Sequence, residues 1–279
     1  MLYLIGSVIL FSINNVLWRH YTPKMNVFQL ISKRAFFTTV FMGIILFLVF
    51  LTQETNFLGH LLGLLTVSLV GFLGLFFMVL GFKKGTVLQF SMYSLLLTCV
   101  LGFIGVQTNA VSFLNKIPEL LIMVFGYLFF VLAQFGTING KQSLLGHVYF
   151  IAAHFCFGIL LFLQWHLLDD LSKVSMAFFQ ELFVFVLAGC IWVFLPAKDN
   201  KQEKIGWWQF ALFALPICFA VLLGLEGLKS TNPFYSALIG LLTPMFTLMI
   251  AIAFGLEKLQ WKPMVGFALI IVGLLLFYF

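Results

Sequence analysis

Long apolar runs separated by short polar segments fill this chain, and they restrict its fold more than any other feature. A helix crosses a bilayer with about 20 apolar residues. Ten runs come close to or exceed that length: 2–18, 26–52, 61–82, 86–106, 117–135, 144–166, 174–195, 207–227, 232–254 and 260–279. The runs lack the two-residue alternation of a membrane β-barrel strand. The sequence therefore predicts an all-α integral membrane protein with ten transmembrane helices.

The composition excludes several classes of protein. Charged residues make up 9% of the 279 residues and hydrophobic residues 63%, whereas a soluble domain is about 25% charged. A soluble enzyme and a free nucleic-acid-binding domain are excluded, so the net charge of +6 is assigned to membrane topology. Four cysteines lie in apolar runs without metal-ligand spacing, and we expect neither a metal nor another cofactor: Cys99, Cys156, Cys190 and Cys218.

The two halves of the chain carry an internal repeat. A shift of 145 residues aligns six identical pairs: Lys84/Lys229, Thr86/Thr231, Ser91/Ser236, Leu96/Leu241, Leu97/Leu242 and Thr98/Thr243. A shift of 147 residues places Trp18 on Trp165 and Arg34 on Glu181. The sequence therefore predicts two five-helix repeats, residues 1–138 and 139–279. Because five is odd, the second repeat is inverted in the membrane, which is the architecture of alternating-access carriers.

Three features of these repeats resemble the drug/metabolite transporter superfamily, specifically its ten-helix EamA-type members. They are the paired hairpins at 81–106 and 224–254, the Leu242-Thr243-Pro244 run, and Gly255-Leu256-Glu257-Lys258 followed by Gly266 and Gly273. The first half departs from this pattern, since Cys99 stands where the second half has Pro244. The resemblance implies transport of a small organic solute, such as an amino acid, another metabolite or a drug. We also expect a bacterial inner-membrane location.

Loop charges predict how the chain is oriented. One side of the membrane receives ten basic residues and the other three: Arg19, Lys24, Lys83, Lys84, Lys141, Lys198, Lys201, Lys204, Lys258 and Lys262 against Lys116, Lys173 and Lys229. Basic loops stay in the cytoplasm, so the charge count predicts that both termini lie outside. The resemblance implies the opposite, with both termini in the cytoplasm.

Charged residues inside the predicted spans are candidates for function because they are costly in lipid. Lys33 and Arg34 lie about 12 Å into the second span, and Glu181 lies equally deep in the seventh. Inversion puts these depths in opposite leaflets, so Arg34 and Glu181 need not touch, and we expect them to mark the two mouths of a cavity. The alternatives are headgroup contacts for Lys33 and Arg34 and a structural ion pair for Glu181.

Polar and aromatic residues within the spans predict a solute site. Unpaired amides are costly in lipid, so Asn14 and Asn15 must face protein or water. We expect these residues to bind substrate: Asn14, Asn15, Trp18, Arg34, Gln89, Tyr93, Ser94, Thr98, Tyr235, Ser236 and Thr243. Ser91, Ser94 and Thr98 share one face of a helix. For the polar side chains, bonding within or between helices is the alternative role.

Three further residues are predicted to act in coupling or gating. Glu181 can bind a proton, Pro244 can kink the ninth span, and His154 can carry a coupling proton. A packed, hydrogen-bonded structural role is the alternative for His154.

Three classes of function follow from these patterns. A carrier is favoured, with the small solute and the bilayer as its partners and with no nucleic acid. A lipid translocator or membrane scaffold is the alternative, and an intramembrane enzyme is disfavoured because no nucleophile–base pair is visible. Gly266 and Gly273 allow the last span to pack closely within the chain or against a second copy, so both a monomer and a homodimer are compatible with the sequence.

Overall fold

The computed structural model describes residues 1–50, 58–107, 116–135, 143–194, 205–255 and 261–278, and every regular element within them is helical. The predicted spans correspond to α1 (Leu2–Tyr21), α2 (Val27–Phe50), α3 (Leu61–Lys84), α4 with α5 (Val87–Ser91 and Ser94–Gln107), α6 (Ile117–Phe135), α7 (Leu144–Leu167), α8 (Lys173–Phe194), α9 (Trp207–Lys229), α10 with α11 (Pro233–Gly240 and Thr243–Ala253) and α12 (Trp261–Tyr278). Short 3-10 turns, η1 (Thr22–Lys24) and η2 (Leu58–His60), precede α2 and α3. Nine spans in the described residues are long enough to cross a membrane, and α6 supplies a shorter apolar one. The prediction of an all-α multi-pass membrane protein is confirmed.

Polar residues at the helix ends explain where the central hairpins turn. The side chain of Thr86 accepts a hydrogen bond from the backbone N–H of Gln89. In return, Oε1 of Gln89 accepts a hydrogen bond from the backbone N–H of Thr86. Asn232 caps α10 in the same way through the N–H of Tyr235, and Pro233 occupies the first helical position. Both devices satisfy N–H groups that a helix start leaves free.

Two of the spans are broken in the middle. The ninth span breaks between α10 and α11, and Pro244 stands at the second position of α11, which agrees with an interruption by this proline. The fourth span breaks between Ser91 and Ser94. No proline lies between α4 and α5, and this second break was not predicted. Ser91, Ser94 and Thr98 therefore do not share one continuous helix.

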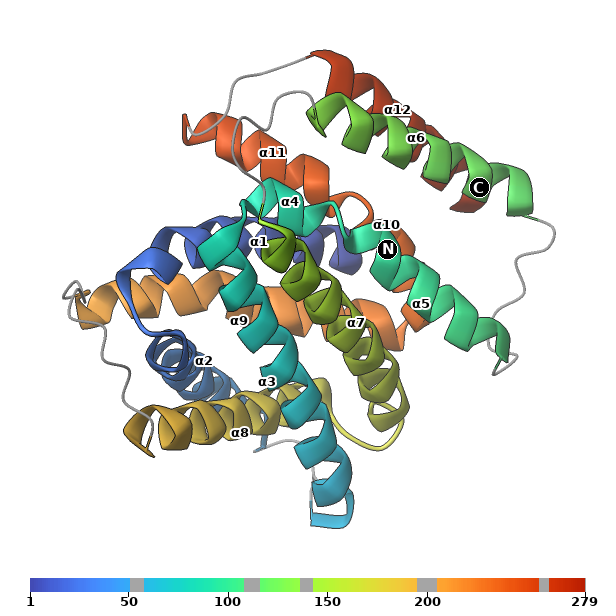
Figure 1. Ribbon diagram of the computed structural model, residues 1–279. Coiled ribbons are helices and arrows are strands. Elements are labelled where there is room, and N and C mark those ends of the chain that lie inside the picture. Colours follow the sequence, from blue (N-terminus) through green and yellow to red (C-terminus); the bar gives the residue numbers. More distant parts are fainter. Residues whose placement is uncertain (51–57, 108–115, 136–142, 195–204, 256–260, 279) are drawn as a thin grey trace.

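The main packing partners of the spans come from opposite halves of the chain. Helix α1 packs on α9, α2 on α8, α3 on α7, and α6 on α12. Figure 1 shows α6 and α12 side by side at one edge of the molecule, and α1 alongside α9. If each span of the first five is exchanged with its counterpart in the second five, the α1–α9 pair becomes the α7–α3 pair. The α2–α8 and α6–α12 pairs stay the same. The predicted boundary at 138/139 lies outside the described residues, so the division into two repeats stays a prediction.

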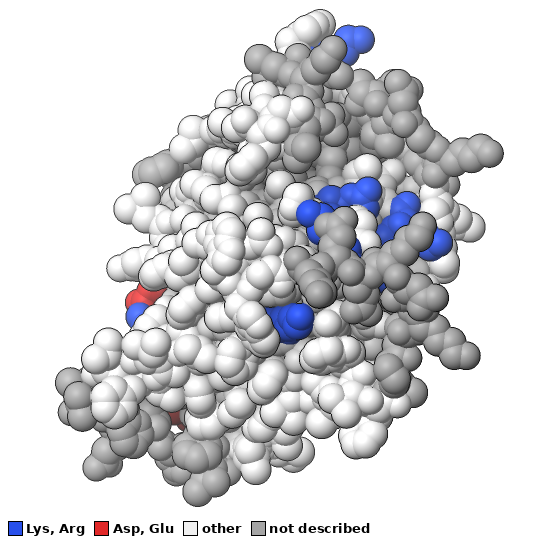
Figure 2. All heavy atoms as spheres, turned by 90° about the vertical axis from the view of Figure 1, so that its left-hand side faces the viewer, with Lys and Arg blue, Asp and Glu red and all other residues white. Residues whose placement is uncertain are grey.

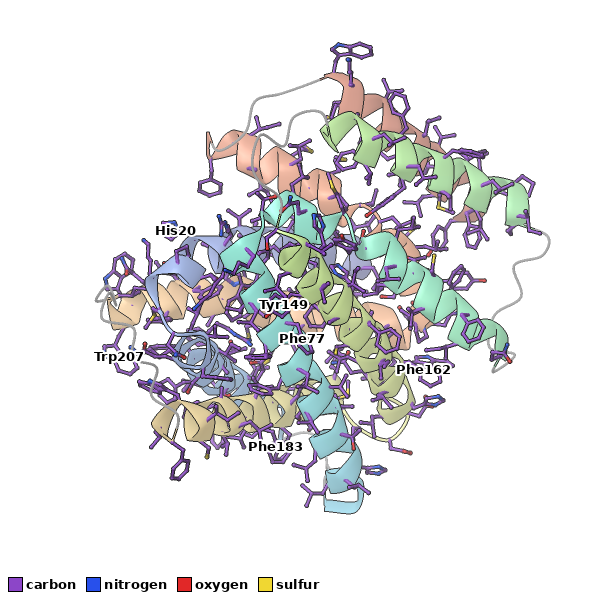
Figure 3. The ribbon with its side chains drawn as sticks, in the orientation of Figure 1. His20, Phe77, Tyr149, Phe162, Phe183 and Trp207 are labelled. Carbon is purple, nitrogen blue, oxygen red and sulfur yellow. The ribbon has the colours of Figure 1, made fainter. Side chains whose placement is uncertain are left out.

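The outer surface of the bundle is apolar. Large side chains such as Phe47, Phe103 and Phe125 are more than half exposed. Figure 3 shows aromatic side chains around the outside, and Phe77 of α3 stacks on Tyr149 of α7 at 6.4 Å between ring centroids. A surface with so many exposed apolar side chains matches a lipid environment.

Basic residues collect at one end of the bundle. Arg19 lies in the last turn of α1, and its guanidinium donates to the carbonyl of Phe82 near the end of α3. Lys24 follows in η1, and Lys83 and Lys84 end α3. Figure 2 shows a face on which lysine and arginine gather. The positive-inside rule would place this end in the cytoplasm.

Candidate functional site

A cavity of about 260 Å³ lies between helices of the two halves. Its wall takes residues from α1, α2, α3, α4 and α5 of the first half and from α7 to α11 of the second. Among the described spans, only α6 and α12 contribute nothing to it. The wall is mostly apolar with a small number of polar side chains, which is typical of a site for a small molecule.

The predicted charged residues meet in the wall of this cavity. Nη1 of Arg34 on α2 lies 2.8 Å from Oε2 of Glu181 on α8, and both side chains are buried. The expectation that these residues lie apart at two mouths is wrong. Each lies about 12 Å into a hydrocarbon layer about 30 Å thick, from opposite faces. The remaining difference in depth is only about 6 Å, which the long arginine side chain spans.

The guanidinium of Arg34 keeps unused hydrogen-bonding capacity. It has five N–H donors, yet Nε and Nη2 have no partner among the described residues. The ring of Trp18 covers its Cζ at 5.4 Å, a cation–π contact. Nε1 of Trp18 and Oδ1 of Asn14 are also buried without a partner. Since unpaired buried polar atoms are costly, this region can gain free energy by pairing with a solute or by rearranging.

Asn14, Asn15 and Trp18 all line the cavity from α1. All three side chains are buried, and they lie within one stretch of five residues, a little over one helical turn. The structure thus brings the polar centre of α1 to the Arg34–Glu181 pair. A second polar contact was not predicted as part of the site: Nε2 of Gln164 donates to Oε1 of Gln180 at 2.7 Å, and both residues line the cavity.

The candidates in the two broken spans separate into those that line the cavity and those that do not. Ser94, Ser236 and Thr243 line it. Thr98 lies behind it and donates to the carbonyl of Ala237 at 3.1 Å. This contact joins α5 to α10, so Thr98 takes the interhelical role that was the alternative for it.

Three further candidates are placed outside the cavity wall. Gln89 belongs to the cap of α4. The hydroxyl of Tyr93 forms a hydrogen bond of 2.7 Å with Nδ1 of His147. Tyr235 packs against Phe277 and other rings of α12. Repeat symmetry identified these residues, but it does not fix which way a side chain points.

His154 lines the cavity and is also held in place. Its Nδ1 lies 2.9 Å from the carbonyl oxygen of Phe150. A carbonyl only accepts, so Nδ1 carries the proton in this contact. The imidazole also packs on Phe90, with 4.5 Å between ring centroids. This arrangement matches the structural alternative, while the position in the wall keeps the residue within reach of a solute.

Aromatic rings cluster beside the cavity at the end where α1 and α3 finish. Trp18 meets Phe213 edge to face at 4.9 Å. Phe90 lines the cavity, and behind it Phe82 and Phe150 complete a triangle of rings with centroids 5.2 to 5.6 Å apart. The opposite end of the bundle carries an ion pair between Lys173 on α8 and Glu226 on α9. The two ends of the bundle thus differ in chemistry.

No group of three or more His, Cys, Asp or Glu residues that could hold a metal ion is found in the part of the chain that the structure describes.

Comparisons with known proteins agree with this architecture. Residues 144–279 match the model of the EamA-like transporter family, and the resemblance seen in the sequence is confirmed. One solved crystal structure superposes with a TM-score of 0.72 over 97% of this chain and 95% of that chain, at 14% sequence identity. At this identity the superposition shows the fold alone. No curated protein sequence matches the chain.

Proposed function

We propose that this EamA-type membrane protein is a carrier that moves a small organic solute across a bacterial inner membrane. The family match supports transport of small solutes. The observation that carries the proposal is the buried Arg34–Glu181 pair in the wall of the cavity. A charge pair inside a membrane marks a substrate or ion path by default.

The pair lies where the two halves of the chain meet. Arg34 comes from the first half and Glu181 from the second, so their contact changes when one half rocks against the other. A solute that competes for the free donors of Arg34 would bind the two arrangements with different affinity. Such a difference is what allows a ligand to shift a conformational equilibrium. This supports alternating access around one cavity.

The wall also supports a class of solute. The cavity of about 260 Å³ fits a single metabolite or small drug. Apolar side chains would hold its body, while Arg34, Asn14 and Asn15 would hold one polar end. Both halves of one chain line the cavity, so we propose that a single copy suffices for transport. The solute and the bilayer are the proposed partners, and we propose no enzymatic activity and no nucleic acid.

Uptake into liposomes tests the role of Arg34. The purified protein is reconstituted and supplied with radiolabelled amino acids, amines, nucleosides and sugars. Arg34→Ala is expected to lower kcat/KM for the transported solute by about tenfold or more, because a hydrogen bond to a charged group contributes about 1.5–3 kcal/mol. The matched control is Lys33→Ala. Its Nζ lies over the rings of Trp207 and Phe210, outside the cavity, and it should transport normally.

Two outcomes would contradict the proposal. Equal transport by Arg34→Ala and wild type would remove Arg34 from the site. Movement of a fluorescent phospholipid by the wild type, with no solute flux, would favour the lipid translocator.

A further inference from the structure

Tyr127 of α6 fills the break between α4 and α5. It lies outside the cavity wall and its side chain is only 1% exposed. Its hydroxyl lies 2.5 Å from the carbonyl oxygen of Met92, 3.2 Å from that of Ser91, and 3.2 Å from Oγ of Ser94. A single hydroxyl has one proton and two lone pairs. It therefore donates to a carbonyl of the break, and the hydroxyl of Ser94 can donate to it in return.

These contacts replace hydrogen bonds that the break removes. In a continuous helix the carbonyl of Met92 would accept from the N–H of Leu96. In this chain the N–H of Leu96 bonds to the carbonyl of Tyr93 instead, at 3.0 Å. A backbone carbonyl left unpaired within a membrane costs several kcal/mol. The hydroxyl of Tyr127 supplies the missing donor.

The two broken spans differ in what holds them apart. Pro244 has no N–H, so the break before α11 is built into the covalent chain. The segment of α4 and α5, residues 87–107, contains no proline. Its break therefore rests on side-chain contacts, among which the hydroxyl of Tyr127 reaches both sides. A break of this kind can be undone by removing one hydroxyl group.

The break also sets the position of the cavity wall. Ser91 at the end of α4 and Ser94 at the start of α5 both line the cavity, and both are partners of Tyr127. We propose that Tyr127 is a latch: it holds the fourth span broken, and its release lets α4 and α5 straighten and reposition Ser91 and Ser94. This inference rests on the proposed carrier function for its role in transport. Tyr127 is then a positioning residue that acts through the wall, and the α6–α12 pair takes part in transport without touching the solute.

The variant Tyr127→Phe tests the latch, because it keeps the ring and removes the hydroxyl. Tyr278→Phe is the matched control. Its hydroxyl also donates to a backbone carbonyl, that of Tyr235, at 3.1 Å, but away from either break. The variant Leu97→Cys places a thiol in the cavity wall, in a background whose four native cysteines are replaced by alanine. The rate at which a small, water-soluble thiol reagent modifies this introduced thiol is measured without solute, and it reports how accessible the wall is to water.

The loss of one hydrogen bond shifts a two-state equilibrium by about fivefold. Tyr127→Phe is expected to change the labelling rate by about this factor, while Tyr278→Phe leaves it unchanged. In transport, Tyr127→Phe is expected to lower kcat by a similar factor and to change KM little. An unchanged labelling rate in Tyr127→Phe would overturn the latch, whatever its transport rate.

The two proposals fail in different ways. A changed labelling rate in a protein that moves no solute would retain the latch and refute the carrier. If Tyr127→Phe does not fold, Ser94→Ala removes the other side-chain partner of the same hydroxyl. Because Tyr127 keeps its own donation to the carbonyl of Met92, Ser94→Ala should change the labelling rate in the same direction by a smaller factor, and an unchanged rate would count against the latch.

Discussion

At the scale of single residues, Arg34 stands out because its charged side chain is buried inside the bundle. Its side chain is almost completely buried, and the carboxylate of Glu181 is the only charged partner that the described residues give it. Burying two charges costs about as much as their attraction returns, so the pair adds little net stability. Removing only one partner is different, because the other charge is left buried and uncompensated. We therefore expect the loss of one partner alone to destabilise the protein more than the loss of both partners.

The first stability prediction follows from this difference. Arg34→Met is expected to destabilise the protein by about 3–5 kcal/mol, and the double variant Arg34→Met/Glu181→Leu should regain most of that loss. Thermal unfolding in detergent measures both. Lys173→Met serves as the control, since it removes the half-exposed pair with Glu226 and should cost about 1 kcal/mol or less. A double variant less stable than the single one would show that the pair is net stabilising.

The candidate site could be predicted from sequence only in part. Charge or amide groups within apolar runs identified Arg34, Glu181 and Asn14, because these groups are rare in a membrane and must be accommodated. The contact between Arg34 and Glu181 could not be predicted, since it depends on how each helix is rotated about its axis. The role of Tyr127 could not be predicted, because a tyrosine within an apolar run is equally compatible with ordinary helix packing.

At the scale of elements, α6 and α12 cross with their backbones almost touching. A Cβ added at Gly266 would lie 2.5 Å from the backbone nitrogen of Phe130 and 2.6 Å from the carbonyl oxygen of Gly126. Gly273 similarly faces the backbone of α6 at Met123. Such small-residue contacts drive helix association in lipid. The sequence left open whether Gly266 and Gly273 pack within the chain or against a second copy, and the structure places α6 against both.

Gly266→Ala tests this crossing. Because rigid backbone atoms occupy the space, the added methyl must push the helices apart, and overpacking of this kind costs about 1–3 kcal/mol. The melting temperature in detergent should fall accordingly. Gly240→Ala is the matched control, because a Cβ there meets nothing within 4 Å; its melting temperature should not fall. Equal melting temperatures for Gly266→Ala and wild type would contradict the tight crossing.

The elements themselves could be predicted well, since length and hydropathy decide them. The predicted run 174–195 corresponds to α8 at Lys173–Phe194, and 207–227 to α9 at Trp207–Lys229. The break between α4 and α5 was missed for a physical reason. A break in a helix is predicted from a proline or a glycine in the sequence, whereas this break is maintained by a hydroxyl group from another helix.

At the scale of the whole molecule, the unequal ends define an orientation. Arg19, Lys24, Lys83 and Lys84 stand at the end where α1 and α3 finish. The first residues of α1 stand at the other end of that helix, 20 residues away. If the basic end is cytoplasmic, as loop charge dictates, the N-terminus is outside. An even number of spans puts the C-terminus on the same side.

Reporter fusions measure this orientation. Alkaline phosphatase fused after Phe279 is expected to be active in a bacterial host, because the enzyme folds only outside the cytoplasm, and a green fluorescent protein at the same site should be dark. The same two reporters inserted after Lys24, at the basic end of the bundle, should give the reverse pattern. A fluorescent C-terminal fusion would instead support the orientation that the family resemblance implies.

The pairing of each span with one from the other half has a consequence for biosynthesis. Arg34 and Glu181 are 147 residues apart in the chain, and a ribosome adds about 5–20 residues per second. The second helix therefore waits about 7–30 s in the membrane before its carboxylate partner is made. During that interval the guanidinium can only reach toward the headgroups. The newborn first half thus lacks its packing partners, and α7, α8, α9 and α12 cover α3, α2, α1 and α6 in turn as they are made.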